Sequence, residues 1–310
     1  MTSCGAPEQK IKLRVTDESG KPLEGVDCMA GFTLEEPNGK WKDTSDKRKS
    51  GPDGIVELQG ETLRCETLVR ATAPGYYKSE IYRYLMTGKA ANRWEPWPVE
   101  VDLVMKKIVK PHPMYAVKPN DKLKFVLPEK GEKTVGFDLL KMDWIAPHGK
   151  GQQADFLLEA RRDSEGAAGH FPPGTMTVTF SNAADGIQPV ASAALGGSLL
   201  VSPQIAPEGG YVTTCRFSSH PLQDGQFPGI DLDRRVWVFR IRTVTDRSGR
   251  VVSAHYGKIQ AAPEVLFFAT GPAFRMTYYV NAEPNEKWLE WDMKTNLFKD
   301  LDRRNWPDRP

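Results

Sequence analysis

Short stretches in which apolar and polar residues alternate recur along the whole chain, and a period of two residues is typical of β-strands with one buried face. Ile11, Leu13 and Val15 alternate with polar residues near the start, and residues 235–242 repeat the pattern much later. No apolar stripe with helical spacing continues for more than about two turns. The pattern therefore predicts an all-β protein.

Turn-forming segments divide the first third of the chain into short strands. Residues 17–23, 51–54 and 71–76 are rich in Gly, Pro, Asp and Ser, which favour tight turns. The connections are short enough for antiparallel pairing, so residues 10–109 predict a seven-stranded β-sandwich. Residues 34–49 form a charged insertion that we expect to be a loop around a tryptophan.

A connector and a second set of strands follow. Pro111 and Pro113 disfavour helix and lack backbone donors, so residues 110–134 predict an extended linker. Alternating segments resume after it, and residues 135–292 predict a second antiparallel β-sandwich. Its clearest hairpin turns at residues 246–249.

The last residues, 293–310, are mostly polar. We expect them to form a tail that either frays or lies back over a sheet through Trp306.

Four spaced motifs in the first domain carry a family resemblance. The segments VTDESGKPLEGVDC, GPDGIVEL, VRATAPGYYKSEI and VEVDLVMKK, in this order, are similar to the carboxypeptidase regulatory-like family. The resemblance covers about a third of the chain. It implies a transthyretin-like, immunoglobulin-like sandwich that supports or connects other domains and has no catalytic role.

The second domain carries a weaker resemblance. The segments FDLLKMDWIAPHGKGQQADF, VSAHYGKIQ and YYVNAEPNEKWLEWDMKTNLF resemble a C-terminal module of uncharacterised bacterial surface proteins. This resemblance implies no activity.

The start of the chain resembles the end of a bacterial lipoprotein signal. Cys4 follows small residues and precedes a short polar stretch. We expect residues 1–9 to be a tether left after removal of a signal peptide, with a lipid on Cys4 as the only membrane contact. The protein would then lie in the bacterial cell envelope, in the periplasm or on the outer surface. The alternative is an ordinary start with an incidental cysteine.

The charge balance bears on possible partners of the chain, and two further cysteines bear on a possible disulfide. The chain has 42 basic and 40 acidic residues, which gives no footprint for a nucleic-acid partner. Cys28 and Cys65 both fall on inward-facing positions of their expected strands. They could form a disulfide across the core or pack as two small buried side chains, and the sequence leaves both open.

Three groups of residues are candidates for binding. Asp143, Trp144 and His148 lie in a glycine-containing segment that could admit a ligand, although a structural loop is the commoner use. Trp288 and Trp291 could present rings to sugars, although core packing is commoner. The carboxylates of a third group could hold calcium, although such loops are usually only solvated; they are Asp224, Asp231 and Asp233.

No motif of a catalytic site is present. The chain lacks G-x-S-x-G and HExxH, and its five histidines are scattered. We therefore expect no cofactor and no enzymatic activity, and interpret the chain as an envelope interaction or assembly module for a protein or a glycan. The alternative is an accessory cell-surface hydrolase with its site near the domain junction, around His148.

Overall fold

The chain is almost entirely β-structure, as the sequence pattern predicts. The computed structural model describes residues 6–36, 38–120, 123, 125–128, 134–162, 174–191, 197–218, 235–260, 263–268 and 271–310. The only helical element among these residues is a single 3-10 turn, η3 (Arg303–Asn305). The described part of the chain contains no helix with the length and apolar character needed to cross a bilayer.

Two compact units divide the chain. Unit 1 comprises Met1–Ile108 together with Ala193–Val201, and unit 2 comprises Val109–Ser192 together with Ser202–Pro310. The backbone therefore leaves unit 1, returns to it for a short segment, and leaves it again.

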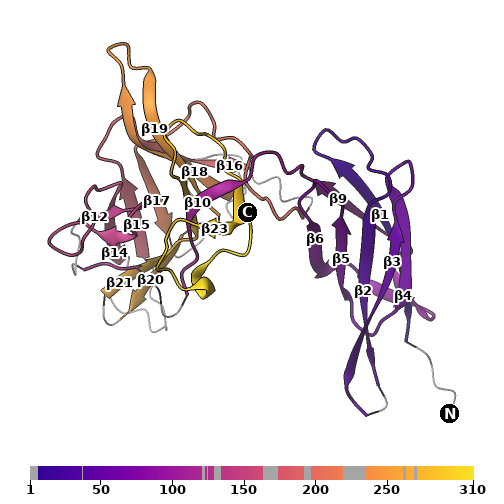
Figure 1. The fold of residues 1–310 in the computed structure, drawn as a ribbon. Coiled ribbons are helices and arrows are strands. Elements are labelled where there is room, and N and C mark those ends of the chain that lie inside the picture. The colour runs from indigo at the N-terminus through magenta and orange to yellow at the C-terminus, as the bar shows by residue number, and fades with distance from the viewer. Residues whose placement is uncertain are drawn as a thin grey trace. The chain divides into compact units, whose positions relative to one another are not determined.

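Unit 1 is a β-sandwich of two facing sheets (Figure 1). Inward-facing Ile11, Leu13, Val69 and Ala71 are fully buried between the sheets. One sheet is built around β1 (Glu8–Asp17), with β4 (Ile55–Glu61) on one side. On the other side β1 pairs along most of its length with β9 (Val99–Met105) and at its first residue with β8 (Arg93–Glu95), which in turn pairs with β7 (Gly88–Ala90). The second sheet has the order β3 (Trp41–Lys49), β2 (Asp27–Glu35), β5 (Glu66–Thr72), β6 (Ser79–Tyr84).

The charged insertion of unit 1 is a hairpin, and the expectation of a loop at residues 34–49 is wrong. Strands β2 and β3 pair in continuous register from Asp27–Lys49 to Glu35–Trp41, and the hairpin extends beyond the other strands in Figure 1. The sequence of β3 shows no alternation of apolar and polar residues, because this strand lies at the edge of its sheet and nearly all of its residues are exposed. Charged side chains are a common way to keep such an edge from pairing with other chains.

Unit 2 is a larger sandwich with a mainly aromatic and aliphatic core. Three sheets surround this core. The first has the order β16 (Gly186–Ala191), β18 (Arg235–Thr245), β19 (Val251–Ile259), β22 (Tyr278–Asn281), β10 (His112–Val117), β23 (Trp291–Asn296). The second has the order β13 (Asp143–Trp144), β12 (Val135–Asp138), β14 (Phe156–Arg162), β15 (Gly174–Thr179), β17 (Thr214–Ser218), and the third β11 (Phe125–Val126), β21 (Gly271–Arg275), β20 (Glu264–Phe268).

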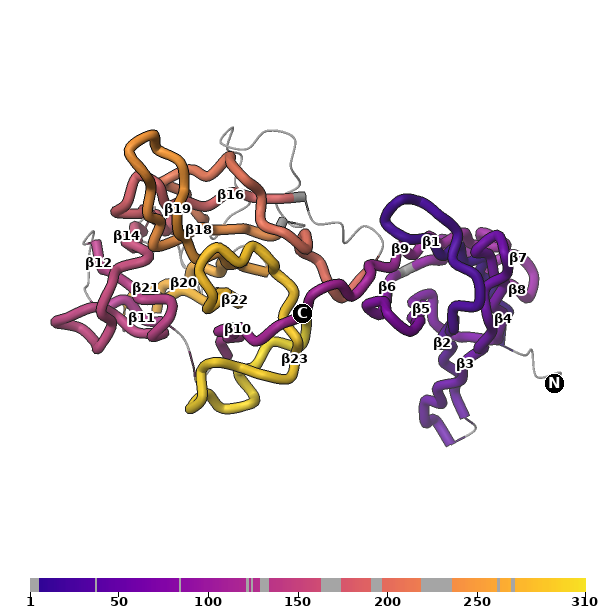
Figure 2. The backbone as a smooth tube through the Cα atoms, turned by 45° about the horizontal axis from the view of Figure 1, so that its top comes forward, coloured from indigo at the N-terminus to yellow at the C-terminus, as the bar shows by residue number. Residues whose placement is uncertain are grey.

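The linker and the tail expected from the sequence are parts of this unit. Strand β10, within the expected linker, pairs with β22 on one side and β23 on the other. Figure 2 shows the C-terminal segment beside β10. Trp306 packs against Trp291 with ring centroids 5.9 Å apart, so the segment lies back over the sheet, which is one of the two expected outcomes.

The returning segment of unit 1 adds to the edge of β6. The amide of Glu80 donates to the carbonyl of Gly197 (2.8 Å), and the amide of Leu199 donates to the carbonyl of Lys78 (2.9 Å). Gly197 has a positive φ of 77°, and a Cβ at this position would lie 2.7 Å from the Glu80 carbonyl oxygen. The atom in the way belongs to the backbone of β6 and cannot move aside as a flexible side chain could, so the pairing requires glycine.

Replacing this glycine should destabilise the protein more than its backbone angle alone explains. Gly75 has the same φ of 77° with open space around it, so Gly75→Ala should cost about 1–2 kcal/mol from the left-handed conformation. Gly197→Ala should cost about 1–3 kcal/mol more, because the methyl group collides with β6. Urea unfolding of both variants tests this; equal losses would show that the segment does not pair with β6.

Candidate functional site

The outward side chains of the sheet β3-β2-β5-β6 in unit 1 form a surface that we call the outer face. Two hollows lie on it and both include Met29. Their linings come from neighbouring strands within this one sheet and the loop before β5. The outer face is therefore a shallow groove supported by a rigid sheet.

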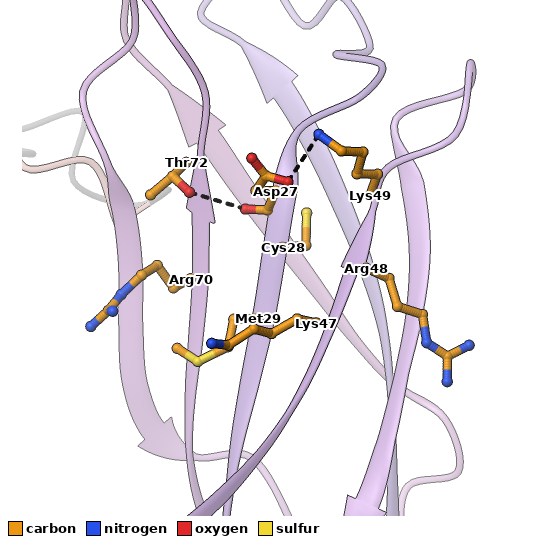
Figure 3. Close-up of a pocket in the computed structure, with 8 residues that line it drawn as sticks. All are labelled: Asp27, Cys28, Met29, Lys47, Arg48, Lys49, Arg70 and Thr72. Carbon is orange, nitrogen blue, oxygen red and sulfur yellow. Dashed lines mark hydrogen bonds and ion pairs between the residues drawn. The ribbon is translucent and has the colours of Figure 1, made fainter.

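The first hollow, the lysine hollow, has a volume of about 520 Å³ (Figure 3). At its centre Met29 pairs with Lys47 on β3 and with Arg70 on β5, so two cations flank one apolar side chain. Nearby, Lys49 forms an ion pair with Asp27 (3.0 Å). The complete lining is Asp27, Cys28, Met29, Lys47, Arg48, Lys49, Arg70 and Thr72.

Ion pairs hold one of these cations in place. The Arg70 guanidinium and the Lys78 ammonium both donate to Glu80 Oε2, at 2.7 Å from Arg70 Nε and 3.0 Å from Lys78 Nζ. Burial alone would raise the pKa of Glu80, but these hydrogen bonds outweigh it and hold the pKa below its usual range. The guanidinium of Arg70 is thus fixed toward β6, while the backbone of Arg70 pairs with Met29 (Figure 3).

The second hollow, the tyrosine hollow, has a volume of about 450 Å³ and centres on Gly31. Gly31 lies between Ser45 and Leu68 in the ladder, and Leu68 pairs in turn with Tyr82. Because Gly31 has no side chain, the floor of the sheet is accessible there. The complete lining is Met29, Gly31, Phe32, Thr33, Asp43, Thr44, Ser45, Arg64, Glu66, Leu68 and Tyr82.

An exposed ring forms one wall of the tyrosine hollow. Tyr82 is 60% exposed, and its hydroxyl donates to Glu66 Oε2 at 2.7 Å. This hydrogen bond raises the pKa of Tyr82, so the phenol stays protonated. The ring is therefore held by one end while most of its surface remains open to solvent.

The outer face has only a weak signal in the sequence. Met29, Gly31 and Thr33 alternate with buried Cys28 and Ala30, and small or apolar residues occupy both faces of this strand. A methionine and a glycine on the solvent side of a strand were the available signal.

Cys28 and Cys65 carry free thiols in the structure, which contradicts the disulfide and favours packing. Cys28 pairs with Ala71 on β5, whereas Cys65 precedes the start of that strand. Cys65 is six residues before Ala71, the partner of Cys28. Six residues of extended chain span about 20 Å, which is far beyond the reach of a disulfide. Cys28 is buried as expected, and Cys65 is only partly buried at the edge of the same core.

The loop that contains Asp143, Trp144 and His148 is fixed by hydrogen bonds within unit 2. Both Asp143 carboxylate oxygens accept backbone amides, one from Trp144 (2.8 Å) and one from Lys150 (2.8 Å). The Trp144 ring packs edge-on against Phe137 at 5.1 Å, and His148 is exposed. Asp143 therefore shapes the loop, and neither hollow described above includes these three residues.

A buried ion cluster anchors both ends of this loop. Arg242 Nη2 donates to Asp138 Oδ1 (2.7 Å), and Arg242 Nε donates to Asp155 Oδ1 (2.8 Å). The two carboxylates are 1% and 0% exposed. Asp138 also accepts four backbone amides from the loop, those of Leu140, Lys141, Gln152 and Gln153.

The backbone of β18 is bent to present this arginine. Arg242 has a positive φ of 55° at a bulge in the pairing of β18 with β19. The bulge turns the amides of Arg242 and Thr243 toward Asp185, which accepts both at 3.0 and 2.8 Å. All three carboxylates are thus saturated with donors, which indicates a structural role for the cluster.

The two candidate tryptophans differ in exposure. Trp291 is 1% exposed and packs against Tyr279, so the expectation that it presents a ring to sugars is wrong and core packing is the outcome. Trp288 is half-buried with the Lys110 ammonium 5.8 Å from its ring centroid.

The remaining candidates cannot be placed. Cys4 and the acidic residues Asp224, Asp231 and Asp233 lie outside the described residues. Within the described part of the chain, no group of three or more His, Cys, Asp or Glu side chains is arranged to hold a metal ion.

Comparison with known proteins assigns no family. No family model and no curated protein matches the chain. Solved structures with some similarity include 3-chlorocatechol 1,2-dioxygenase from Rhodococcus opacus, at 9% identity and a TM-score of 0.28 over 35% of this chain and 63% of the dioxygenase, which is less than two thirds of its length.

Two further similarities are to bacterial proteins. A mutant of the shaft pilin SpaA from Lactobacillus rhamnosus GG has 17% identity and a TM-score of 0.23 over 57% of this chain and 89% of the pilin. A DUF3823 family protein from Parabacteroides merdae has 9% identity and a TM-score of 0.20 over 88% of this chain and 98% of that protein. Scores this low carry no argument about activity or partner.

The thiol of Cys28 should be unreactive in the folded protein. Burial raises the pKa of Cys28 to about 11, so almost none of it is thiolate at pH 8. Iodoacetamide labelling followed by mass spectrometry should modify Cys28 only after denaturation, and non-reducing peptide mapping should find no link to Cys65. Recovery of a peptide that joins the two would contradict the register described above.

Removal of Arg242 should be strongly destabilising. Arg242→Met leaves two buried carboxylates without a cation, which should cost about 3–5 kcal/mol in urea unfolding. Arg250→Met is the control, because Arg250 forms an exposed pair with Asp246 and should cost at most about 1 kcal/mol. Similar losses in both variants would contradict a structural role for the cluster.

The loss in free energy of unfolding caused by Arg242→Met should become smaller as the pH falls. Burial raises the pKa of Asp155, and the hydrogen bond from Arg242 opposes that rise. Without the arginine the pKa of Asp155 in the folded protein rises further above that of the unfolded chain. The folded variant therefore binds a proton at a higher pH than the unfolded chain does, and its stability relative to the wild-type protein increases toward acidic pH. Urea unfolding between pH 8 and pH 5 measures this trend.

Proposed function

We propose that the chain is a non-enzymatic module of the bacterial cell envelope that binds a glycan along the outer face of unit 1. The observation that carries the proposal is the pair of hollows that share Met29, because together they extend over neighbouring strands of one sheet. A surface of this kind can hold an extended ligand without any rearrangement of the backbone.

The chemistry of the outer face favours a glycan over a peptide. Peptides that bind by strand addition need the unpaired backbone groups of a sheet edge, whereas β2 and β5 are paired on both sides. The outer face offers side chains instead. An exposed ring such as Tyr82 can stack against a sugar, and the hydroxyls and charges around it can bond the sugar hydroxyls.

The groove favours binding over catalysis. Among the residues that line the two hollows, Cys28 is the one cysteine, and its thiol is buried with a raised pKa. Neither hollow is lined by a histidine. The carboxylates of Asp27 and Glu66 already bond to Lys49 and Tyr82, which leaves them poorly placed for proton transfer.

The location in the envelope is supported by the lipoprotein-like residues around Cys4 and by the four motifs similar to the carboxypeptidase regulatory-like family. In this proposal the lipid on Cys4 is the only contact with the membrane, and unit 1 acts close to the anchor.

Filling the floor of the tyrosine hollow should abolish binding without harm to the fold. A Cβ on Gly31 would lie 3.6 Å from Leu68 Cβ, an ordinary contact, and valine is favoured in strands. A glycan array probed with the intact chain should show binding that Gly31→Val weakens by about tenfold or more. Gly88→Val on β7 is the matched control, because a Cβ there would meet no atom within 4 Å, and it should bind normally. Equal binding by both variants would contradict the proposed site.

A further inference from the structure

The lysine hollow carries an excess of positive charge. The lining of the lysine hollow contains four cations, Lys47, Arg48, Lys49 and Arg70, and one carboxylate, that of Asp27. Two further carboxylates, those of Asp46 and Glu80, pair with Arg48 and Arg70. The whole chain of 310 residues has a formal net charge of only +2. The lysine hollow is therefore locally basic although the chain as a whole is close to neutral.

Lys47 differs from the other cations of this group because its side chain forms no ion pair with any residue that the structure describes. Among the described residues, Lys49 bonds to Asp27 and Arg70 bonds to Glu80, but the ammonium group of Lys47 has no hydrogen-bond or ion-pair partner. Figure 3 shows its side chain beside that of Met29. Since Lys47 and Arg70 lie on strands at either side of Met29, their backbones are about 10 Å apart, which leaves room for a charged group above the methionine.

The tyrosine hollow has the opposite character. Its carboxylates, Asp43 and Glu66, accept hydrogen bonds from the neutral hydroxyls of Thr33 and Tyr82. Its one cation, Arg64, lies 4.6 Å from the centroid of the Trp41 ring. An anionic group would be repelled here, whereas a neutral ring could stack on Tyr82 above Gly31.

We infer that the ligand is an acidic glycan, with an anionic sugar over Met29 between Lys47 and Arg70 and a neutral sugar over Gly31 beside Tyr82. The inference rests on the function proposed above and adds the chemical class of the ligand. Met29 and Gly31 are two residues apart on one face of β2, so the two positions are separated by about 7 Å along the strand.

A hyaluronan oligosaccharide, in which glucuronate alternates with N-acetylglucosamine, is a suitable probe. Its carboxyl-reduced form has the same backbone without the charge. Isothermal titration calorimetry with the intact chain should show about tenfold or more tighter binding of the acidic form. An oligogalacturonate, which is charged on every ring, should bind more weakly than hyaluronan because a second carboxylate would face Asp43 and Glu66.

Two lysine variants of one strand separate local recognition from overall charge. Lys47→Gln should lose most of the preference for the acidic form. Lys42→Gln removes the same charge from the opposite face of β3 and should keep the preference. Equal binding of the two hyaluronan forms, or no binding of hyaluronan, would overturn the inference. So would an unchanged preference in Lys47→Gln, or binding of oligogalacturonate as tight as that of hyaluronan.

The same experiment distinguishes this inference from the proposed function. Binding of neutral glycans that Gly31→Val abolishes and Lys47→Gln does not affect would leave the outer face as the site and reject only an acidic ligand. Absence of any glycan binding that Gly31→Val weakens would reject both.

Discussion

The pairing of β2 with β3 on one side and β5 on the other is the constraint on which the outer face depends. It places Lys47 and Arg70 at either side of Met29, and Ser45 and Leu68 at either side of Gly31. The same register directs Cys28, Ala30 and Phe32 into the core. A shift by one residue would exchange the two faces, so the packing of the core fixes the arrangement of the groove.

In unit 2 a buried ion cluster fixes a long loop. Arg242 joins carboxylates from the two ends of the loop, and each carboxylate also accepts backbone amides. Such a cluster is costly when incomplete, because an unpaired buried charge destabilises the fold. The loop with Asp143 and His148 was a candidate for binding in the sequence, because it combines a carboxylate, an aromatic ring and an imidazole. In the structure the Asp143 carboxylate accepts backbone amides and shapes that loop.

Strands with one buried face were predictable because burial imposes a period of two on their residues. The alternation at residues 235–242 lies within β18, Arg235–Thr245, and the predicted turn at residues 246–249 follows directly after this strand. Strand β3 was missed because an edge strand exposed on both sides need not alternate, and β10 was missed because prolines at 111 and 113 resemble a linker. The candidate site was missed because exposed Met29 and Tyr82 resemble ordinary surface residues in sequence.

Local alternation and turn chemistry are enough to predict the all-β class, the turns and most of the strands of both units. The tertiary structure decided which distant residues meet. It separated Cys28 from Cys65, joined Arg242 to carboxylates about 90 and 100 residues away, and brought Lys47 beside Met29. Strand order and register depend on the packing of complete sheets, which no local pattern contains.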